Sequence, residues 1–229
     1  MNYQELTQTL SDPKLIKCLR TAKNNSEKAI QLYHEQNVYV GNFLSLISYF
    51  EMILSHRINS YMTSTYKPNW LIILSRPECV LDQQNTIHTF TTLAKTRNRL
   101  SKIDQLNNGN MANNLGFDFW VGIFQPKQHA KLNNLPINVF SYAPRTEKLL
   151  FQIHRNLNQC RKIRNEVIRL ENVIFRKNSS TIDFGRVEAI IGKIVKLTRW
   201  LGVSPTIYDR QLLELKFQKQ VIRKLIPKN

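Results

Sequence analysis

The chain has 229 residues, enough to bury a substantial core in one or two domains. Its 33 Lys and Arg residues outnumber its 16 Asp and Glu residues, which gives a net charge of +17 at pH 7. This excess favours a polyanionic partner, with RNA or DNA ahead of an anionic membrane, although a well-solvated surface also explains it. Residues 145–229 carry most of the excess, with 19 basic and 7 acidic side chains.

The cysteine pattern gives no support to a metal-bound or disulfide-stabilised fold. Cys18, Cys79 and Cys160 are widely spaced and form no Cys-x-x-Cys pair, so neither a zinc site nor a disulfide framework is indicated. We therefore expect buried free thiols in a cytoplasmic protein that holds no metal and no cofactor.

The helical spacing of apolar residues predicts the first elements of the chain. A short helix is expected from Pro13 to about Ala22, and Ser26 is expected to cap another. A long amphipathic helix is predicted over about 37–66, ending before Pro68. Its apolar stretch is interrupted by polar side chains, which predicts a core helix rather than a membrane span.

Turn residues divide the next part of the chain. A loop through residue 77 precedes a polar helix predicted over about 82–104, and Asn-Asn-Gly at 107–109 predicts a turn. An aromatic-rich helix is predicted over 111–124, with its aromatic side chains in the core. Residues 125–142 contain two prolines and little periodicity, and they predict an ordered loop.

The central element of the basic half is a helix predicted over about 145–175. Its apolar residues step by three or four positions and so share one face; they are Leu149, Ile153, Leu157, Cys160, Ile163, Val167 and Leu170. Two further helices are predicted over about 186–201 and 205–226. Without a convincing strand or a flexible linker, the prediction is a single all-α bundle over residues 1–229.

One sector of this central helix carries polar groups of chemical interest. An α-helix turns by about 100° per residue, so one sector of this helix contains Arg161, Arg164, Asn165 and Ile168. Glu171 follows Arg164 by seven residues and nearly eclipses it. A half-buried Arg–Glu arrangement that ties the helix to a neighbour explains the pattern structurally. A guanidinium at the edge of a core can also hold a phosphate and stabilise transition-state charge, with Asn165 orienting it.

Proton transfer is the missing part of the functional interpretation. Metal-free RNA cleavage by the 2′-OH usually needs a group that titrates near neutral pH, such as histidine, whereas Arg169 stays protonated. His154 lies on roughly the same face as Arg164 but about 15 Å along the axis, so it is not expected to serve the same phosphate within one subunit.

Other basic clusters predict phosphate contacts without sequence preference. They lie on the helix predicted over 82–104 and on the last two helices, where solvated helix faces explain them about equally well. Together with one residue of the central helix, the candidate RNA-binding residues are Arg161, Lys95, Arg97, Arg99, Lys193, Lys196 and Arg199.

Three segments, in this order, resemble blocks of the Abi-like (AbiD/AbiF) abortive-infection proteins of bacteria, which belong to the HEPN superfamily. They are residues 46–59 (LISYFEMILSHRIN), 115–124 (LGFDFWVGIF) and 163–175 (IRNEVIRLENVIF), and the likeness covers about residues 30–202.

Position by position, the third block carries most of the resemblance. Arg164, Asn165 and Glu171 match the family pattern, Arg169 stands where the catalytic histidine is expected, and Leu170 replaces a second histidine. In the first block, a serine at position 55 replaces a common arginine.

The resemblance implies an all-helical HEPN-like core with an N-terminal helical extension and a basic C-terminal helix. It also implies a homodimer that joins two Arg-Asn helices in one cleft of a metal-independent endoribonuclease. By position, Arg164, Asn165 and Arg169 would be the catalytic set, with Glu171 as structural support. The implied role is phage defence or toxicity, in some relatives together with a small structured RNA.

Several functions therefore stay open. The first is an Abi-like RNA-binding protein of antiviral-defence or toxin–antitoxin type, either a ribonuclease or, because of Arg169, a catalytically impaired one. The second is a non-enzymatic scaffold that forms a ribonucleoprotein with a structured small RNA. A membrane-surface or protein-interaction bundle is a third, although the apolar residues it would use fit core contacts better.

Overall fold

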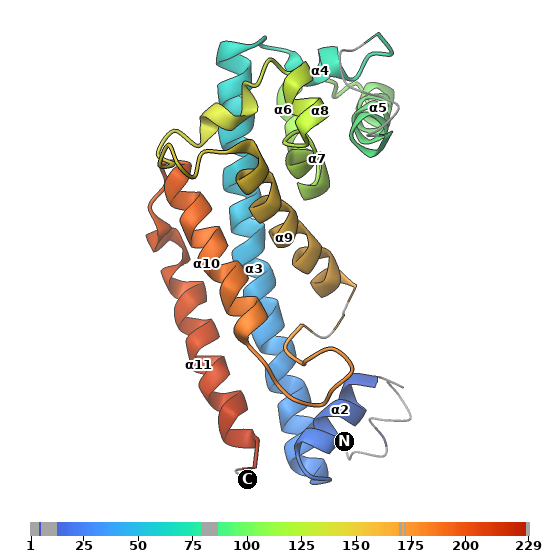
Figure 1. The fold of residues 1–229 in the computed structure, drawn as a ribbon. Helices are drawn as coiled ribbons and strands as arrows, with labels where there is room; N and C mark the ends of the chain where they lie inside the picture. The colour runs from blue at the N-terminus through green and yellow to red at the C-terminus, as the bar shows by residue number, and fades with distance from the viewer. Residues whose placement is uncertain (1–4, 6–12, 79–86, 170, 172, 228–229) are drawn as a thin grey trace. The chain divides into compact units, whose positions relative to one another are not determined.

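The fold is built almost entirely from helices. Figure 1 shows the computed structural model, which describes residues 5, 13–78, 87–169, 171 and 173–227. Within these residues, extended pairing is confined to one isolated antiparallel bridge between Phe175 and Ile182. The all-α prediction is confirmed, while its HEPN-like character remains a prediction.

The chain divides into two compact units, each built from segments far apart in the sequence. The first unit comprises Met1–Ser48, Lys162–Gly192 and Pro205–Asn229, and the second comprises Tyr49–Arg161 and Lys193–Ser204. That residues 1–229 form a single domain stays a prediction.

The first unit begins with two helices, α2 (Pro13–Thr21) and the N-terminal part of α3 (Ser26–Thr65). The prediction of two separate helices after residue 25 is wrong, because α3 is continuous over 40 residues. Buried side chains continue at helical spacing from Ala29 onwards, so no break in packing separates the two predicted helices. Its N-terminus is capped by Asn25 rather than Ser26, because the Asn25 Oδ1 accepts a hydrogen bond from the Lys28 amide at 2.9 Å.

The remaining helices of this unit come from the basic half of the chain: the end of α9 (Leu150–Ile168), the start of α10 (Gly185–Trp200), the 3₁₀ helix η2 (Pro205–Tyr208) and α11 (Asp209–Leu225). In the predicted last helix, residues 205–208 form this 3₁₀ turn before α11. An ion pair between Lys219 of α11 and Glu188 of α10 joins these two helices, and the Lys219 ammonium also lies 5.5 Å from the Phe184 ring centroid.

Helix α9 is shorter at both ends than the predicted helix 145–175. Its predicted core positions from Ile153 to Val167 are buried, but Leu149 is 52% exposed and precedes the helix. At the other end, the Glu171 amide bonds to the Glu166 carbonyl at 2.9 Å, five residues back, a pattern that closes helices. Val173, Ile174 and Phe175 are all buried, and three consecutive residues cannot share one narrow helix face. Leu170 lies outside the described residues.

The second unit gathers short helices around an aromatic core. Beside parts of α3, α9 and α10, it contains α4 (Trp70–Leu74), α5 (Ile87–Lys102), α6 (Asn108–Asn113), α7 (Phe117–Gly122), α8 (Pro126–Lys131) and the 3₁₀ helix η1 (Pro136–Val139). Helices α4, α5, α6 and α7 pack against one another. Trp70, Phe119 and Trp120 lie with ring centroids 5.0–6.5 Å apart, which confirms the predicted aromatic core.

Four predictions within this unit need correction. The loop expected before residue 77 contains α4, and the loop expected over 125–142 contains α8 and η1. The helix expected over 111–124 is divided into α6 and α7, because Gly116 is extended between them. Asn107, expected in a turn, caps α6 by accepting a hydrogen bond from the Asn110 amide at 2.8 Å.

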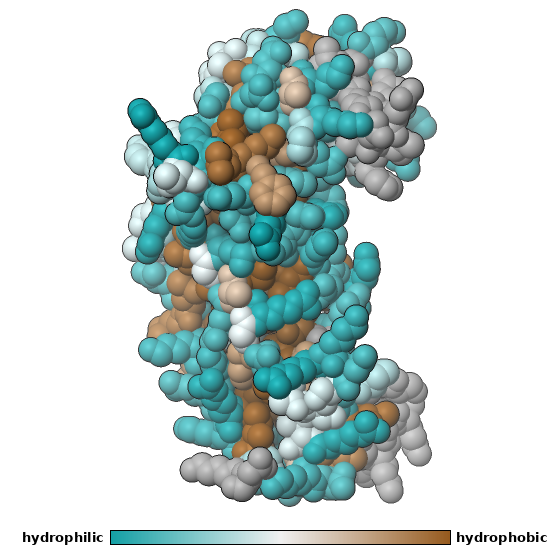
Figure 2. All heavy atoms as spheres, in the orientation of Figure 1, coloured by the Kyte–Doolittle hydropathy of each residue, from teal (hydrophilic) through white to brown (hydrophobic). Residues whose placement is uncertain are grey.

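The surface is largely hydrophilic on the face drawn in Figure 2, with hydrophobic side chains visible in patches between polar ones. Among the described helices, α3 alone is long and apolar enough to cross a membrane by length and composition, a test that core helices also pass. Its apolar side chains Phe43, Ile47, Phe50 and Leu54 are buried. The expected buried free thiols are found at Cys18 and Cys160, whereas Cys79 lies outside the described residues.

Candidate functional site

Arg164 and Asn165 lie near the C-terminal end of α9. The buried side chains of Ile163 and Val167 anchor this turn of the helix to the core, which leaves Arg164 and Asn165 half-buried at its edge. The Arg164 Nη1 donates a hydrogen bond to the Asn165 Oδ1 at 3.2 Å. The amide thus orients the guanidinium as expected, at a position that solvent reaches.

Arg169 and Glu171 lie beyond the end of this helix. Their side chains approach to 3.8 Å and are 72% and 51% exposed, so they form an exposed ion pair with each other. The prediction that Glu171 eclipses Arg164 on one helical face is therefore wrong, because α9 ends at Ile168. An arginine supplies positive charge and hydrogen-bond donors but no proton acceptor, so Arg169 does not replace the expected histidine chemically.

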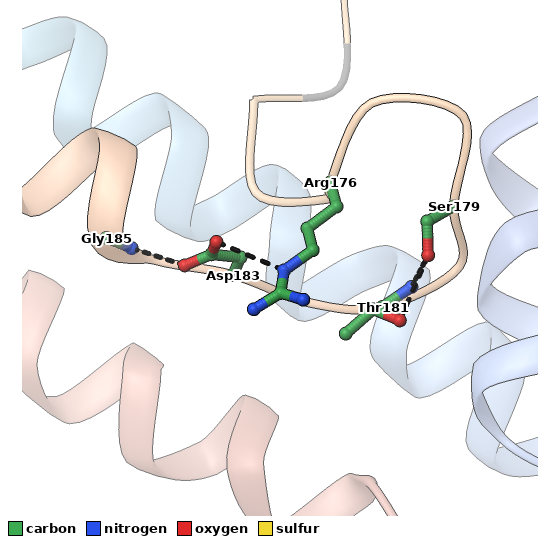
Figure 3. A network of polar contacts seen from close by, with 5 residues as sticks. All are labelled: Arg176, Ser179, Thr181, Asp183 and Gly185. Carbon is green, nitrogen blue, oxygen red and sulfur yellow. Dashed lines mark hydrogen bonds and ion pairs between the residues drawn. The ribbon is translucent and has the colours of Figure 1, made fainter.

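Residues 173–184 form a compact hairpin instead of further helix. Figure 3 shows its polar contacts: the Asp183 Oδ1 accepts a bond from the Gly185 amide at 2.8 Å, and the Asp183 Oδ2 lies 3.4 Å from the Arg176 Nε. The Gly185 amide and the Arg176 guanidinium both lower the pKa of the Asp183 carboxyl below its usual value. A further bond joins the hairpin to α2, because the Thr21 hydroxyl of α2 donates to the Ser180 carbonyl.

This hairpin encloses a cavity of about 760 Å³ together with α2 and the end of α9. Its charged lining residues are Lys17, Arg176, Lys177, Arg186, Glu166, Glu171 and Asp183. Arg176 and Arg186 are already paired, to Asp183 and to Glu166, and hydrogen bonding to Glu166 raises the pKa of Arg186. The cavity is therefore close to neutral, and Arg164, Asn165 and Arg169 are not among its lining residues.

In the second unit, Arg161 has two fixed partners. Its Nε donates to the Asn158 Oδ1 at 2.9 Å, and its Nη1 lies 2.7 Å from the Asp118 Oδ1 of α7. The guanidinium is thus held in one orientation, with 31% of the side chain exposed. The sequence predicts only a general role in binding phosphate for Arg161, and its pairing with a residue 43 positions away was not predictable.

The predicted RNA-binding residues of α5 point in part to solvent. Lys95 and Arg99 are exposed and lie four residues apart, hence on one face. Arg99 donates to the Asn114 side chain at 2.7 Å, and half-buried Arg97 donates to Asn98. Lys95 has no ion-pair partner among the residues that the structure describes, and it is available to a phosphate.

The basic side chains of α10 also differ in whether they are paired and in how exposed they are. Lys196 forms an ion pair with Glu147 and lies 4.6 Å from the Trp200 ring centroid, so it has a structural role. Half-buried Lys193 is close enough to Cys160 to act on its pKa, although burial dominates and raises the pKa of that thiol to about 12. Arg199 is exposed, and no ion pair of the described residues includes it.

The described residues form no metal centre, and the buried His129 has a structural role. Within the described part of the chain, no group of three His, Cys, Asp or Glu side chains is arranged to hold a metal ion. His129 is buried, and its ring nitrogens contact the Asn134 side chain at 2.9 Å and the Ile137 amide at 3.2 Å, a structural role.

Comparisons with known proteins give no neighbour for this chain: no family model, no curated protein and no solved structure matches it.

Proposed function

We propose that this protein binds RNA as a member of the Abi-like type of HEPN protein, in phage defence or as a toxin. The observation that carries the proposal is the half-buried Arg164 guanidinium, held by Asn165 at the solvent edge of α9 in a chain of net charge +17. Such a guanidinium suits a phosphate, because it stays charged and presents several donors in one plane. Exposed Lys95 and Arg199 would add contacts that do not depend on RNA sequence.

Within this proposal, the segment from Arg164 to Glu171 binds RNA without transferring protons. Arg169 takes the place of the expected histidine, and its exposed pairing with Glu171 leaves it outside the helix that carries Arg164. A homodimer, which the family resemblance implies, would bring two Arg164 side chains to one RNA strand. A structured small RNA that the protein retains is compatible with the same contacts.

The test is RNA binding by the full chain at several salt concentrations. Labelled structured RNA should bind with a linear fall of log affinity against log salt, because each phosphate contact releases counterions. Arg164→Gln is expected to weaken binding about 10- to 100-fold, since a hydrogen bond to a charged group contributes about 1.5–3 kcal/mol. It should also lower the salt slope by about 0.7–0.9.

Arg145→Gln is the matched control, because it removes the same charge from an exposed position before α9. Equal losses in the two variants would show that binding follows net charge alone, and an absence of RNA binding at moderate salt would reject the proposal. Light scattering on the same samples gives the oligomeric state. If a monomer binds the RNA, the homodimer is rejected while the RNA-binding proposal stands.

A further inference from the structure

A second cavity, of about 450 Å³, lies in the second unit and is lined by α5, α7 and α9. This volume falls within the range of pockets that hold small ligands. Close approach of α5 and α7 shapes one wall, because a Cβ on Gly122 would lie only 2.7 Å from the Thr89 Oγ1. The polar side chains that line the cavity are Thr89, Thr92, Asp118, Gln125, His154, Asn158 and Arg161.

Helix α9 contributes three of these groups from a single face. His154, Asn158 and Arg161 are spaced by four and three residues, which places them above one another along the helix. Helical side chains lean toward the N-terminus, and the Arg161 Nε accordingly reaches back to the Asn158 Oδ1 at 2.9 Å. The Arg161 guanidinium therefore lies beside the Asn158 side chain, on the side of its own backbone position that faces His154 along the helix.

Arg161 keeps donors for a ligand after these contacts. A guanidinium has five N–H groups, and the bonds to Asn158 and Asp118 use two of them. Asp118 is 57% exposed, so solvent screens its charge, while the bond still fixes the orientation of the guanidinium. An oriented arginine of this kind loses little conformational freedom when it binds a phosphate.

His154 supplies an imidazole that can accept a proton, a group that the segment from Arg164 to Glu171 lacks. It is half-buried, and its burial together with the nearby Arg161 charge lowers the pKa of the imidazole below 6.5. The ring is therefore mostly neutral at pH 7 and can accept a proton. The charged groups that line this cavity are Asp118 from α7 and Arg161 from α9, while α5 contributes the hydroxyl groups of Thr89 and Thr92.

We propose that this cavity holds one nucleotide unit of a bound RNA, with Arg161 on its phosphate and His154 on its ribose 2′-OH. The inference rests on the proposed function, because RNA has to be the ligand. Asn158, which holds the guanidinium, lies about 6 Å along the helix from His154, a separation that a ribose and its 3′-phosphate can span. Neither Arg161 nor His154 belongs to the segment from Arg164 to Glu171.

In this arrangement the cavity supports strand cleavage without a metal ion. His154 takes the proton of the 2′-OH, the 2′-oxygen forms a bond to phosphorus, and the bond from phosphorus to the 5′-oxygen breaks. Arg161 stabilises the charge on the phosphoryl oxygens during this exchange. The leaving 5′-oxygen takes a proton from water, and the imidazolium returns its proton to solvent. The products are a 2′,3′-cyclic phosphate and a 5′-hydroxyl.

The experiment compares wild type with His154→Gln, on a labelled single-stranded RNA in the presence of a chelator. His34→Gln is the matched control, because His34 is exposed on α3 and is not among the residues that line this cavity. Wild type and His34→Gln should cut the RNA to cyclic-phosphate products but leave a 2′-O-methylated copy intact. His154→Gln should cut the RNA about 10²–10⁴-fold more slowly.

Two outcomes overturn this inference while leaving RNA binding and the proposed function intact: RNA that wild type binds but does not cut, and equal cutting by His154→Gln. Absence of any RNA binding overturns both. If His154→Gln does not fold, the imidazole resonance of His154 in labelled wild type decides the matter. Uridine 3′-monophosphate should shift that resonance, and an unchanged resonance overturns the proposal.

Discussion

Two of the three arginines of helix α9, Arg161 and Arg164, lie in contrasting surroundings. Arg161 is held by Asn158 and Asp118 in a cavity that also contains His154, whereas Arg164 bonds to its neighbour Asn165 at an open edge. Arg164 belongs to the segment that resembles a catalytic motif, yet the histidine-containing cavity lies with Arg161. A charged group could hold a phosphate in either place, but bond cleavage also needs a proton acceptor within reach.

The largest expected effect tests whether the two regions can exchange their roles. In a His154→Gln background, Arg169→His returns the expected histidine to the segment of Arg164. We expect cleavage to recover by about 10²-fold or more, the usual contribution of one proton-transfer group. Quantifying the cyclic-phosphate product for the single and double variants checks this. If activity does not recover, a histidine at position 169 does not make the segment of Arg164 catalytic.

Lysine replacements should separate the two arginines kinetically. Arg161→Lys retains the charge but cannot hold Asn158 and Asp118 together, so kcat should fall about 100-fold, as for loss of an oriented transition-state donor. Arg164→Lys should act mainly on RNA binding and therefore raise KM. Steady-state kinetics on one RNA substrate measures kcat and KM for both variants. If the two variants change kcat and KM in the same way, the two arginines do not have different roles.

The pH dependence should report the His154 imidazole. Its pKa lies below 6.5 because burial and Arg161 both disfavour the protonated ring. Cleavage should rise about tenfold per pH unit below that pKa, since only the neutral ring accepts a proton, and should level off toward neutral pH. A kcat/KM profile from pH 4.5 to 8 tests the sign, and a rate that falls with rising pH contradicts it.

The smallest effects concern stability at the end of α9. Glu166→Gln removes the carboxylate that lies 2.6 Å from Arg186, and Glu166 is only 26% exposed, so a loss of about 0.5–1 kcal/mol in unfolding free energy is expected. Arg169→Gln breaks a longer, more exposed pair and should cost less than about 0.5 kcal/mol. Urea denaturation of both variants provides the comparison, and the reverse order would contradict these pairings.

Local sequence patterns predicted much of the helical structure. The short helix α2, the start of α10 and the buried positions of α9 from Ile153 to Val167 all follow from capping residues and apolar spacing. The aromatic core of the second unit followed from composition. These features depend on residues within about one or two helical turns, which is the range over which periodicity is informative.

The errors arose where local patterns gave incomplete information. The apolar spacing of α9 continues past Ile168, but Val173, Ile174 and Phe175 are buried in a hairpin, and the helix closes before them. Conversely, turn-forming asparagines and prolines concealed the short helices α6 and α8. Local propensity competes with tertiary packing at such ends, and packing prevailed here.

The sequence by itself determined the helical class, the excess of positive charge and the Arg164-Asn165 pair. Only the tertiary structure decided which side chains meet, as in the Arg161–Asp118 ion pair and the cavity that includes His154. The physical reason is range. Helical periodicity and charge are properties of neighbouring residues, whereas a cavity is formed by helices whose separation in the sequence carries no signal of their proximity.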